Sequence, residues 1–139
     1  MRAPAQGAMR ASLPLRLLPE TFAVCRLEPD AAVPAWANES RVFLTVSRTA
    51  EELSITAEQR VVPAAGRCER DYRLLRVEGP LPFDLVGVFA SIAGPLAAAG
   101  ISIFPIATFD TDHVLVKAAD LERAVAALER AGHRVATAG

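Results

Sequence analysis

Cysteine and histidine are scarce in this chain, with two of each among 139 residues. Cys25 and Cys68 lie far apart, which fits neither the short spacing of a metal-binding motif nor the density of a disulfide-rich scaffold. We therefore expect two reduced thiols in a protein of the cytoplasm, where disulfides are rare. The composition predicts no metal site and no other cofactor.

Motifs for catalysis and phosphate binding are also missing. The sequence contains no P-loop, no Gly-x-Gly-x-x-Gly and no zincin motif. His113 and His133 have no serine or cysteine beside them in a nucleophile motif, so both are predicted to be packing or solvated histidines. Asp110 and Asp112 lack a third ligand for Mg²⁺ or Ca²⁺, which favours turn formation, with ligand gating as the alternative. We expect that the chain is not an enzyme.

Neither sign of charge dominates, because 15 basic residues balance 16 acidic ones. Such a chain offers no electrostatic surface for nucleic acid or for a membrane. Residues 1–17 lack an apolar core suited to export and are predicted to be a flexible tail. The uncharged run Leu85–Phe109 is long, but Pro95, Gly100 and Pro105 interrupt it, so we expect no membrane-spanning helix.

The second half of the chain alternates between strand and helix patterns. We predict a strand, a helix, a hairpin of two strands, a second helix and a last strand, at Tyr72–Val77, Leu85–Ala99, Ile101–Phe109, His113–Lys117, Leu121–Gly132 and His133–Thr137. Asp120 is the predicted N-cap of the second helix. This order predicts an α+β fold.

The first half begins in the same way but lacks a full second helix. We predict strands at Thr21–Leu27, Arg41–Ser47 and Leu53–Thr56, helical turns within Asp30–Asn38, and a linker at Pro63–Arg70. Residues 18–66 are therefore predicted to be a degenerate version of the unit that is complete in residues 67–139. Because the first half has little helix to cover its sheet, we expect both halves to share one core.

This order of elements resembles the ACT domain, a small βαββαβ module. The closer resemblance is to small bacterial ACT-domain proteins related to the CASTOR family of cytosolic arginine sensors. The segments that carry it are Cys25-Arg26-Leu27, Pro34-Ala35-Trp36, Val77-Glu78-Gly79-Pro80, Gly100-Ile101-Ser102-Ile103 and Thr108-Phe109-Asp110-Thr111-Asp112. The resemblance implies two ACT-like, ferredoxin-like units packed side by side, the N-terminal one degenerate.

The resemblance also implies a ligand site where the first strand of a unit meets its first helix. That site maps onto Phe83, Asp84, Leu85, Val86 and Gly87, joined by Thr108 and Asp110 of the hairpin turn. A helix start exposes unpaired N–H groups and a partial positive charge, which suit the carboxylate of an amino acid, while Asp84 suits its ammonium. The alternatives are that Asp84 only caps the helix and that Gly87 only permits close packing.

Three residues depart from the family's pattern on the hairpin side of this site. Family members often have a small residue where Pro105 stands, a serine where Ala107 stands and an aromatic residue where His113 stands. These departures bear on the part of the site that the Ile101–Phe109 strand would build.

From the residues and the resemblance together we expect a non-catalytic regulatory protein that binds a small amino acid at a unit or subunit interface. The alternative is a structural or protein-interaction module with no ligand. The helix Leu85–Ala99 has an apolar stripe and a side of small residues, and one sheet can cover only one of them. We therefore expect a homodimer.

Overall fold

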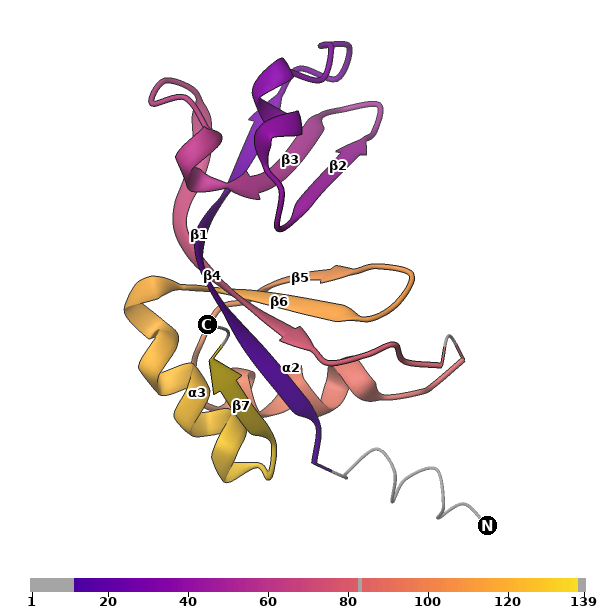
Figure 1. Cartoon of the computed structure of the whole chain (residues 1–139), viewed down its shortest axis with the longest axis vertical. Coiled ribbons are helices and arrows are strands. Elements are labelled where there is room, and N and C mark those ends of the chain that lie inside the picture. The colour runs from indigo at the N-terminus through magenta and orange to yellow at the C-terminus, as the bar shows by residue number, and fades with distance from the viewer. Residues whose placement is uncertain (1–11, 83, 138–139) are drawn as a thin grey trace. The chain divides into compact units, whose positions relative to one another are not determined.

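The computed structural model describes residues 12–82 and 84–137. These residues form two compact units (Figure 1). The helical unit combines residues 12–19 with residues 73–137, and the inserted unit is Glu20–Tyr72. Two long strands, β1 (Pro14–Leu27) and β4 (Arg67–Val77), contribute residues to both units.

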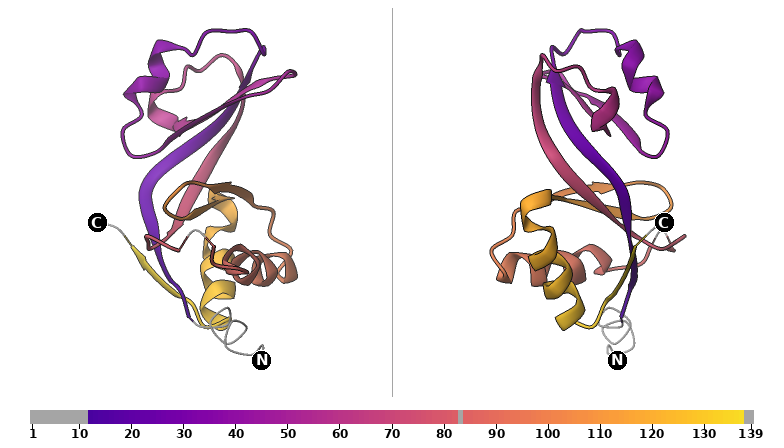
Figure 2. Two further views of the ribbon diagram at one scale, coloured as in Figure 1. Left: turned by 90° about the vertical axis from the view of Figure 1, so that its right-hand side faces the viewer. Right: turned by 60° about the vertical axis from the view of Figure 1, so that its left-hand side comes forward.

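The helical unit contains the predicted order of strands and helices. After β4 come α2 (Val88–Ala98), β5 (Phe104–Ala107), β6 (Asp112–Lys117), the 3₁₀ turn η3 (Ala118–Asp120), α3 (Leu121–Arg130) and β7 (Arg134–Thr137). The two helices lie on one face of the sheet (Figure 2). The α+β prediction is confirmed, although α2 begins three residues later than expected. None of the helices in the described ranges is long and apolar enough to cross a bilayer.

The N-terminal strand completes the sheet of the helical unit. The first residues of β1 pair in parallel with β7, from Pro14 opposite Arg134 to Leu17 opposite Thr137. The sheet order in this unit is β7, β1, β4, β6, β5, so β1 lies between the last and the first strand of the βαββαβ unit. Residues 14–17, which were predicted to belong to a flexible tail, are strand residues, whereas residues 1–11 of that tail lie outside the described residues.

The core of the helical unit follows from the apolar spacing of its elements. Val88, Ile92 and Leu96 recur every four residues along α2 and are buried. Ile92 and Leu96 pack in one cluster with residues of α3 and of the strands β1, β4 and β6: Leu15, Leu17, Leu75, Val77, Val114, Val116, Ala124, Ala127 and Leu128. The strand β1 therefore contributes buried side chains to this core.

The inserted unit is a small antiparallel sheet with 3₁₀ turns in place of helices. The second half of β1 pairs with β3 (Leu53–Glu58), which pairs with β2 (Leu44–Arg48). The turns η1 (Ala35–Glu39) and η2 (Gln59–Val61) accompany them. The unit has its own cluster of Ala23, Cys25, Ala37, Leu53, Ile55, Ala57 and Val62, so the prediction of a single shared core is wrong. The predicted linker is also too long, because β4 begins at Arg67.

Cys25 and Cys68 form a disulfide. The prediction of two reduced thiols is therefore wrong. The two cysteines lie on β1 and β4, which are neighbours in the sheet. Only this strand pairing brings them together, so their spacing in the sequence could not reveal it.

A buried carboxylate organises the loop that leads into β2. Glu58 is 2% exposed, and its Oε2 accepts the backbone N–H groups of Arg41 and Val42, both at 2.6 Å. Its Oε1 accepts the Nε–H of Arg60 at 2.9 Å. Burial raises the pKa of Glu58, but the Val42 and Arg41 N–H groups and Arg60 outweigh burial, so the pKa lies below its ordinary value.

We predict that Glu58→Gln lowers the free energy of unfolding by about 1.5–3 kcal/mol, because it removes charge-assisted hydrogen bonds that a buried carboxylate accepts. Because the pKa of Glu58 is lower in the folded protein than in the unfolded chain, its carboxylate stabilises the fold fully above the unfolded pKa of about 4.3. That stability is lost as the pH falls through the pKa of the folded state. Urea unfolding from about pH 7 down to about pH 3 measures both effects. Glu39→Gln, at an exposed position of the same unit, is the control. An equal pH dependence in both variants would contradict the assignment.

We also predict that a fragment beginning at Tyr72 does not melt cooperatively, because it lacks the strand that pairs with β7 and the buried Leu15 and Leu17. In the full chain, Leu15→Ala should cost about 2–5 kcal/mol. Val33→Ala, where the side chain is 43% exposed, should change stability by less than about 0.5 kcal/mol. Calorimetry decides the matter: a fragment that melts at the temperature of the intact chain would show that β1 is dispensable.

Candidate functional site

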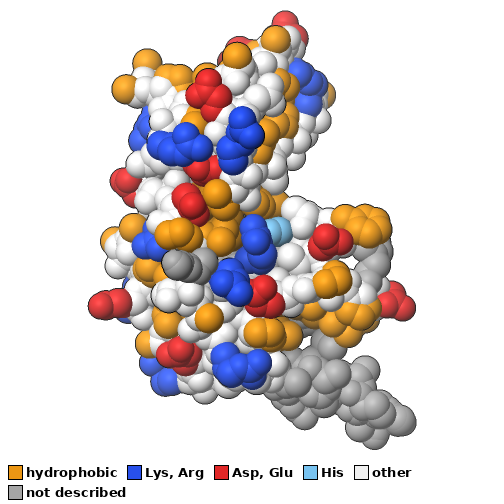
Figure 3. All heavy atoms as spheres, in the orientation of Figure 1, with side chains coloured by type: hydrophobic (Ala, Val, Ile, Leu, Met, Phe, Trp, Pro, Cys, Tyr) orange, Lys and Arg blue, Asp and Glu red, His pale blue; other side chains and the backbone are white. Residues whose placement is uncertain are grey.

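A groove of about 500 Å³ lies in the helical unit between the start of α2 and the β5–β6 turn. We call it the α2 groove. One side is lined by Leu81, Pro82, Leu85 and Val88, and the other by residues 107–112. Hydrophobic and acidic side chains lie next to one another on this side of the helical unit (Figure 3). The groove is therefore mainly apolar, with polar groups grouped at the turn.

One backbone hydrogen bond and one from a side-chain hydroxyl hold the two sides of the α2 groove together. The N–H of Leu81 donates to the carbonyl of Asp110 at 2.8 Å, and the Thr111 hydroxyl donates to the carbonyl of Val77 at 2.7 Å. A Cβ atom at Gly79 would lie 3.1 Å from the Cβ of Thr111 and 3.2 Å from the carbonyl of Asp110. Glycine at position 79 thus permits the close approach of this segment to the turn.

The structure brings three of the predicted site residues into one place. Leu85, Thr108 and Asp110 all line the α2 groove. Asp84 and Val86 are exposed on the same segment but do not line the groove, and Phe83 lies outside the described residues. Of the predicted residues, the groove therefore combines Leu85 from the segment before α2 with Thr108 and Asp110 from the turn, and it does not include Asp84.

The start of α2 differs in detail from the sequence prediction. Its N-cap is Gly87, with φ of 84°, and no side chain caps the helix. The alternative that Asp84 serves as a cap is therefore wrong. Glycine at position 87 is explained by this left-handed conformation, which other residues adopt only with strain. Asp120 does hold the N-cap position of α3, although its side chain makes no capping hydrogen bond.

Other lining residues were not among the predicted site. Asp112 lies at the start of β6 opposite Ala107, so its carboxylate joins that of Asp110 at the groove. Phe109 lines the same turn and is 81% exposed. Both residues lie in the Thr108–Asp112 segment, and the run of Asp and Thr residues around Phe109 was the available signal.

The α2 groove presents both signs of charge within one hollow. The first intrahelical bond of α2 runs from the N–H of Ser91 to the carbonyl of Gly87 at 3.1 Å, so the N–H groups of residues 88–90 precede the hydrogen-bonded ladder. These groups give the helix start a partial positive charge. The carboxylates of Asp110 and Asp112 lie on the facing turn. The groove is suited to a ligand that carries both a carboxylate and an ammonium group.

A second hollow of about 350 Å³ adjoins the same turn and contains His113. This histidine is 4% exposed. Burial lowers the pKa of His113, and the positive charge of Arg76 lowers it further. A hydrogen bond with the backbone of Ile106 and the negative charge of Asp112 act in the opposite direction but do not outweigh these effects. His113 is therefore a neutral packing residue at neutral pH. Among the described residues, no group of three or more His, Cys, Asp or Glu side chains is placed to hold a metal ion.

Comparison with known proteins identifies two matched regions. A family model described as an ACT domain matches residues 67–130, and a model described as an N-terminal domain matches residues 20–65. The cytosolic arginine sensor for mTORC1 subunit 1 of Homo sapiens is 47% identical over 60 residues. That match covers 42% of this chain and 18% of the sensor, so this chain spans less than a fifth of the length of that curated relative.

Solved structures are similar over nearly the whole chain. A crystal structure of a protein from Agrobacterium tumefaciens is 34% identical, has a TM-score of 0.86, and the match covers 92% of this chain and 95% of that one. A Vibrio cholerae protein described as a possible transport protein has a TM-score of 0.72 at 22% identity, with 90% and 94% coverage. The regulatory subunit of aspartate kinase from Thermus thermophilus has a TM-score of 0.54 at 15% identity, with 81% and 93% coverage. The last two show a shared fold.

We predict that Gly79→Ala lowers the free energy of unfolding by about 1–3 kcal/mol, because its Cβ atom must displace the β5–β6 turn. Gly94→Ala is the matched control, since a Cβ at this position in α2 meets nothing within 4 Å. That change should stabilise the protein by about 0.4–1 kcal/mol. Thermal unfolding of both variants makes the comparison, and equal shifts of the same sign would refute the packing argument.

Proposed function

This chain belongs to the family of ACT-domain proteins, and we propose that it is a non-catalytic regulatory protein that binds an amino acid in the α2 groove. The observation that carries the proposal is the arrangement of Asp110 and Asp112 opposite the uncapped start of α2. The ligand carboxylate would accept hydrogen bonds from the N–H groups of the helix start. Its ammonium would donate to a carboxylate of the turn.

The size and lining of the α2 groove support a small organic ligand. A volume of about 500 Å³ lies within the usual range for small-molecule sites, which are mostly apolar with a few polar groups. Leu81, Leu85 and Val88 would contact the aliphatic part of the ligand. If one of the Asp110 and Asp112 carboxylates pairs with the ammonium of the ligand, the other is left for a second cationic group on the ligand. Because the human relative is named as an arginine sensor, arginine is the first probe.

The open side of the α2 groove supports the proposed homodimer. Apolar side chains lie exposed at its rim and on the segment before α2: Val86 at 72%, Phe109 at 81% and Leu85 at 38%. A second copy that covers these side chains would remove apolar surface from water and close the ligand site. Light scattering at micromolar concentration tests this part of the proposal, and a monomer would contradict it.

The proposed compartment is the cytoplasm. The curated relatives are named as cytosolic sensors, and this is the support for the proposal. The Cys25–Cys68 disulfide makes this an unusual expectation, because cytoplasmic disulfides are mostly transient.

The second candidate is a protein-interaction module with the same fold and no small ligand. It is favoured by the same exposed apolar side chains, which a partner protein would cover equally well. The two candidates differ in one property, which is whether a free amino acid stabilises the protein.

We predict that at least one common amino acid, with arginine tested first, raises the free energy of unfolding by about 2.7 kcal/mol at 100 times its dissociation constant. Asp110→Asn and Asp112→Asn should each weaken its binding by about 1.5–3 kcal/mol, because each removes a charged hydrogen-bond acceptor. Asp84→Asn, outside the groove lining, is the matched control. Thermal-shift screening followed by calorimetry supplies both measurements.

Two outcomes would contradict this proposal in different ways. No stabilisation by any amino acid would favour the interaction module. Binding that survives both Asp110→Asn and Asp112→Asn unchanged would place the ligand elsewhere. Gly87→Val is a poor test, because a valine with the φ of 84° seen at Gly87 is strained whether or not a ligand is bound.

A further inference from the structure

We propose that Cys68 is a site of reversible thiol–disulfide exchange, at which a small thiol that carries carboxylates opens the Cys25–Cys68 bond. The two sulfur atoms differ in their surroundings. Cys25 is 3% exposed and belongs to the buried cluster of the inserted unit, whereas Cys68 is only partly buried at its edge. An attacking thiol therefore reaches the sulfur of Cys68 first.

Hollows give access to this disulfide. One of about 280 Å³ is lined by both cysteines together with Val24, Arg26, Arg67 and Glu69. The second, of about 120 Å³, also contains both cysteines and includes Trp36 and the loop before β4. We call them the Glu69 hollow and the Trp36 hollow. A disulfide whose only role is to cross-link two strands of a core requires no access for a small molecule.

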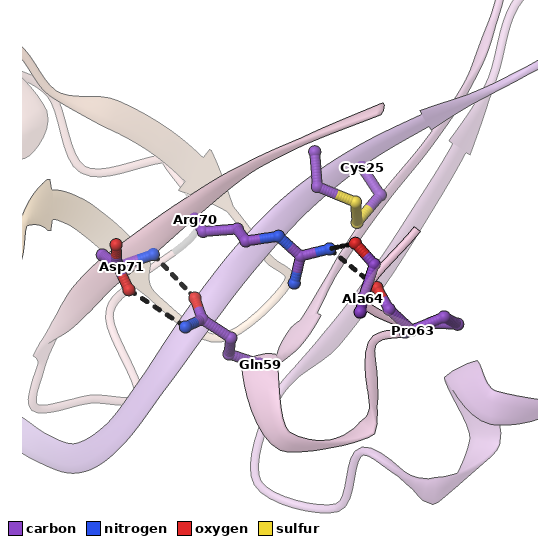
Figure 4. The surroundings of a disulfide bond; sticks show 7 residues. Cys25, Gln59, Pro63, Ala64, Arg70 and Asp71 are labelled. Atoms are coloured by element: carbon purple, nitrogen blue, oxygen red, sulfur yellow. Dashed lines mark hydrogen bonds between the residues drawn. A yellow bond between two sulfur atoms is a disulfide. The ribbon is translucent and has the colours of Figure 1, made fainter. Parts of the chain in front are cut away.

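Basic side chains surround the bond and select the charge of the thiol. Arg26 and Arg67 line both hollows, while Glu69 lines only the larger one. Arg70 reaches toward the disulfide and donates to the carbonyls of Pro63 at 2.7 Å and Ala64 at 3.3 Å (Figure 4). Positive charge stabilises a leaving thiolate and attracts an anionic thiol, so a peptide thiol with free carboxylates fits this site.

The exchange step balances without any other reactant. The thiolate of the small molecule attacks the Sγ of Cys68, a new S–S bond forms there, and the Cys25–Cys68 bond breaks. Cys25 leaves with the electron pair as a thiolate, which takes a proton from water. A second small thiol can then attack the small molecule's sulfur in the mixed disulfide and release Cys68. The net change is reduction of the protein disulfide and oxidation of two small thiols.

Opening the bond removes a cross-link between two neighbouring strands, at the edge of the cluster that also includes Trp36. The inserted unit should lose stability, because the unfolded chain is no longer constrained by the bond. Trp36 is the only tryptophan of the sequence and lines the Trp36 hollow with both cysteines. Since disulfides quench tryptophan emission at short range, its fluorescence reports the state of the bond.

The test is to mix the folded protein, with its disulfide intact, with reduced glutathione. The fluorescence emission of Trp36 and the mass of the protein are then followed over time. We expect emission to rise, an adduct of one glutathione on Cys68, and Cys25 as a free thiol, all faster than global unfolding. Reduction no faster than unfolding, or an adduct on Cys25, would overturn the proposal and leave an ordinary structural disulfide. Because this experiment uses the natural chain, it does not depend on a cysteine variant folding.

Variants test the charge selection. Arg67→Gln should slow the reaction with glutathione about threefold at low ionic strength and should not slow the reaction with the cationic thiol cysteamine. Arg130→Gln, an exposed change on α3 in the helical unit, should leave both rates unchanged. An unchanged ratio of the two rates in Arg67→Gln would refute the role of the arginines. In Cys25→Ser, where Cys68 is a free thiol, the Cys68 thiolate should attack oxidised glutathione, form a mixed disulfide and release one reduced glutathione. An unreactive Cys68 in that variant would also contradict the proposal.

Discussion

The pairing of β1 with two different partners is the constraint on which both units depend. Its first residues pair in parallel with β7 and its last residues pair antiparallel with β3. Leu15 and Leu17 consequently belong to the core of the helical unit, and Ala23 and Cys25 belong to that of the inserted unit. Since successive side chains of a strand alternate between faces, a shift of one residue in either pairing would move these side chains out of their clusters.

The α2 groove depends on a few close contacts between the β5–β6 turn and the segment that leads from β4 to α2. The hydrogen bond from Leu81 to Asp110 and that from Thr111 to Val77 fix the turn against the segment before α2. Gly79 permits this approach because it has no Cβ. In a groove whose frame is held in this way, a few side chains of the turn would decide which ligand fits, while the fold stays the same.

The sequence predicted those elements whose local pattern agrees with their final burial. Ile92 and Leu96 indicated α2 through helical spacing, and both are fully buried. The predicted start at Leu85 was wrong because Leu85 and Val86 lie exposed in a segment without helical structure before a left-handed Gly87. Leu15 and Leu17 alternate with Arg16, which is a strand pattern, and the prediction of a flexible tail gave it too little weight.

Contacts between distant segments were beyond sequence reasoning for a different reason. The Cys25–Cys68 bond follows from the adjacency of β1 and β4, which no spacing rule expresses. The sequence did place Asp110 and Asp112 at one turn, but only the β5–β6 hairpin, in which Asp112 lies opposite Ala107, puts both residues in the lining of the α2 groove. The resemblance to a known family indicated the region of the proposed site, but the membership of each residue required the fold.

The three departures from the family pattern have unequal weight once their positions are known. Pro105 is exposed on the edge strand β5, where a missing N–H discourages pairing with another strand, and it does not line the groove. His113 lines the adjoining hollow and is not among the residues that line the α2 groove. Ala107 lines the α2 groove itself, and alanine there offers no hydroxyl where the family resemblance leads us to expect serine. Ligand specificity at the proposed site would therefore rest on the carboxylates of the turn and on the helix start, because β5 supplies no polar side chain to the groove.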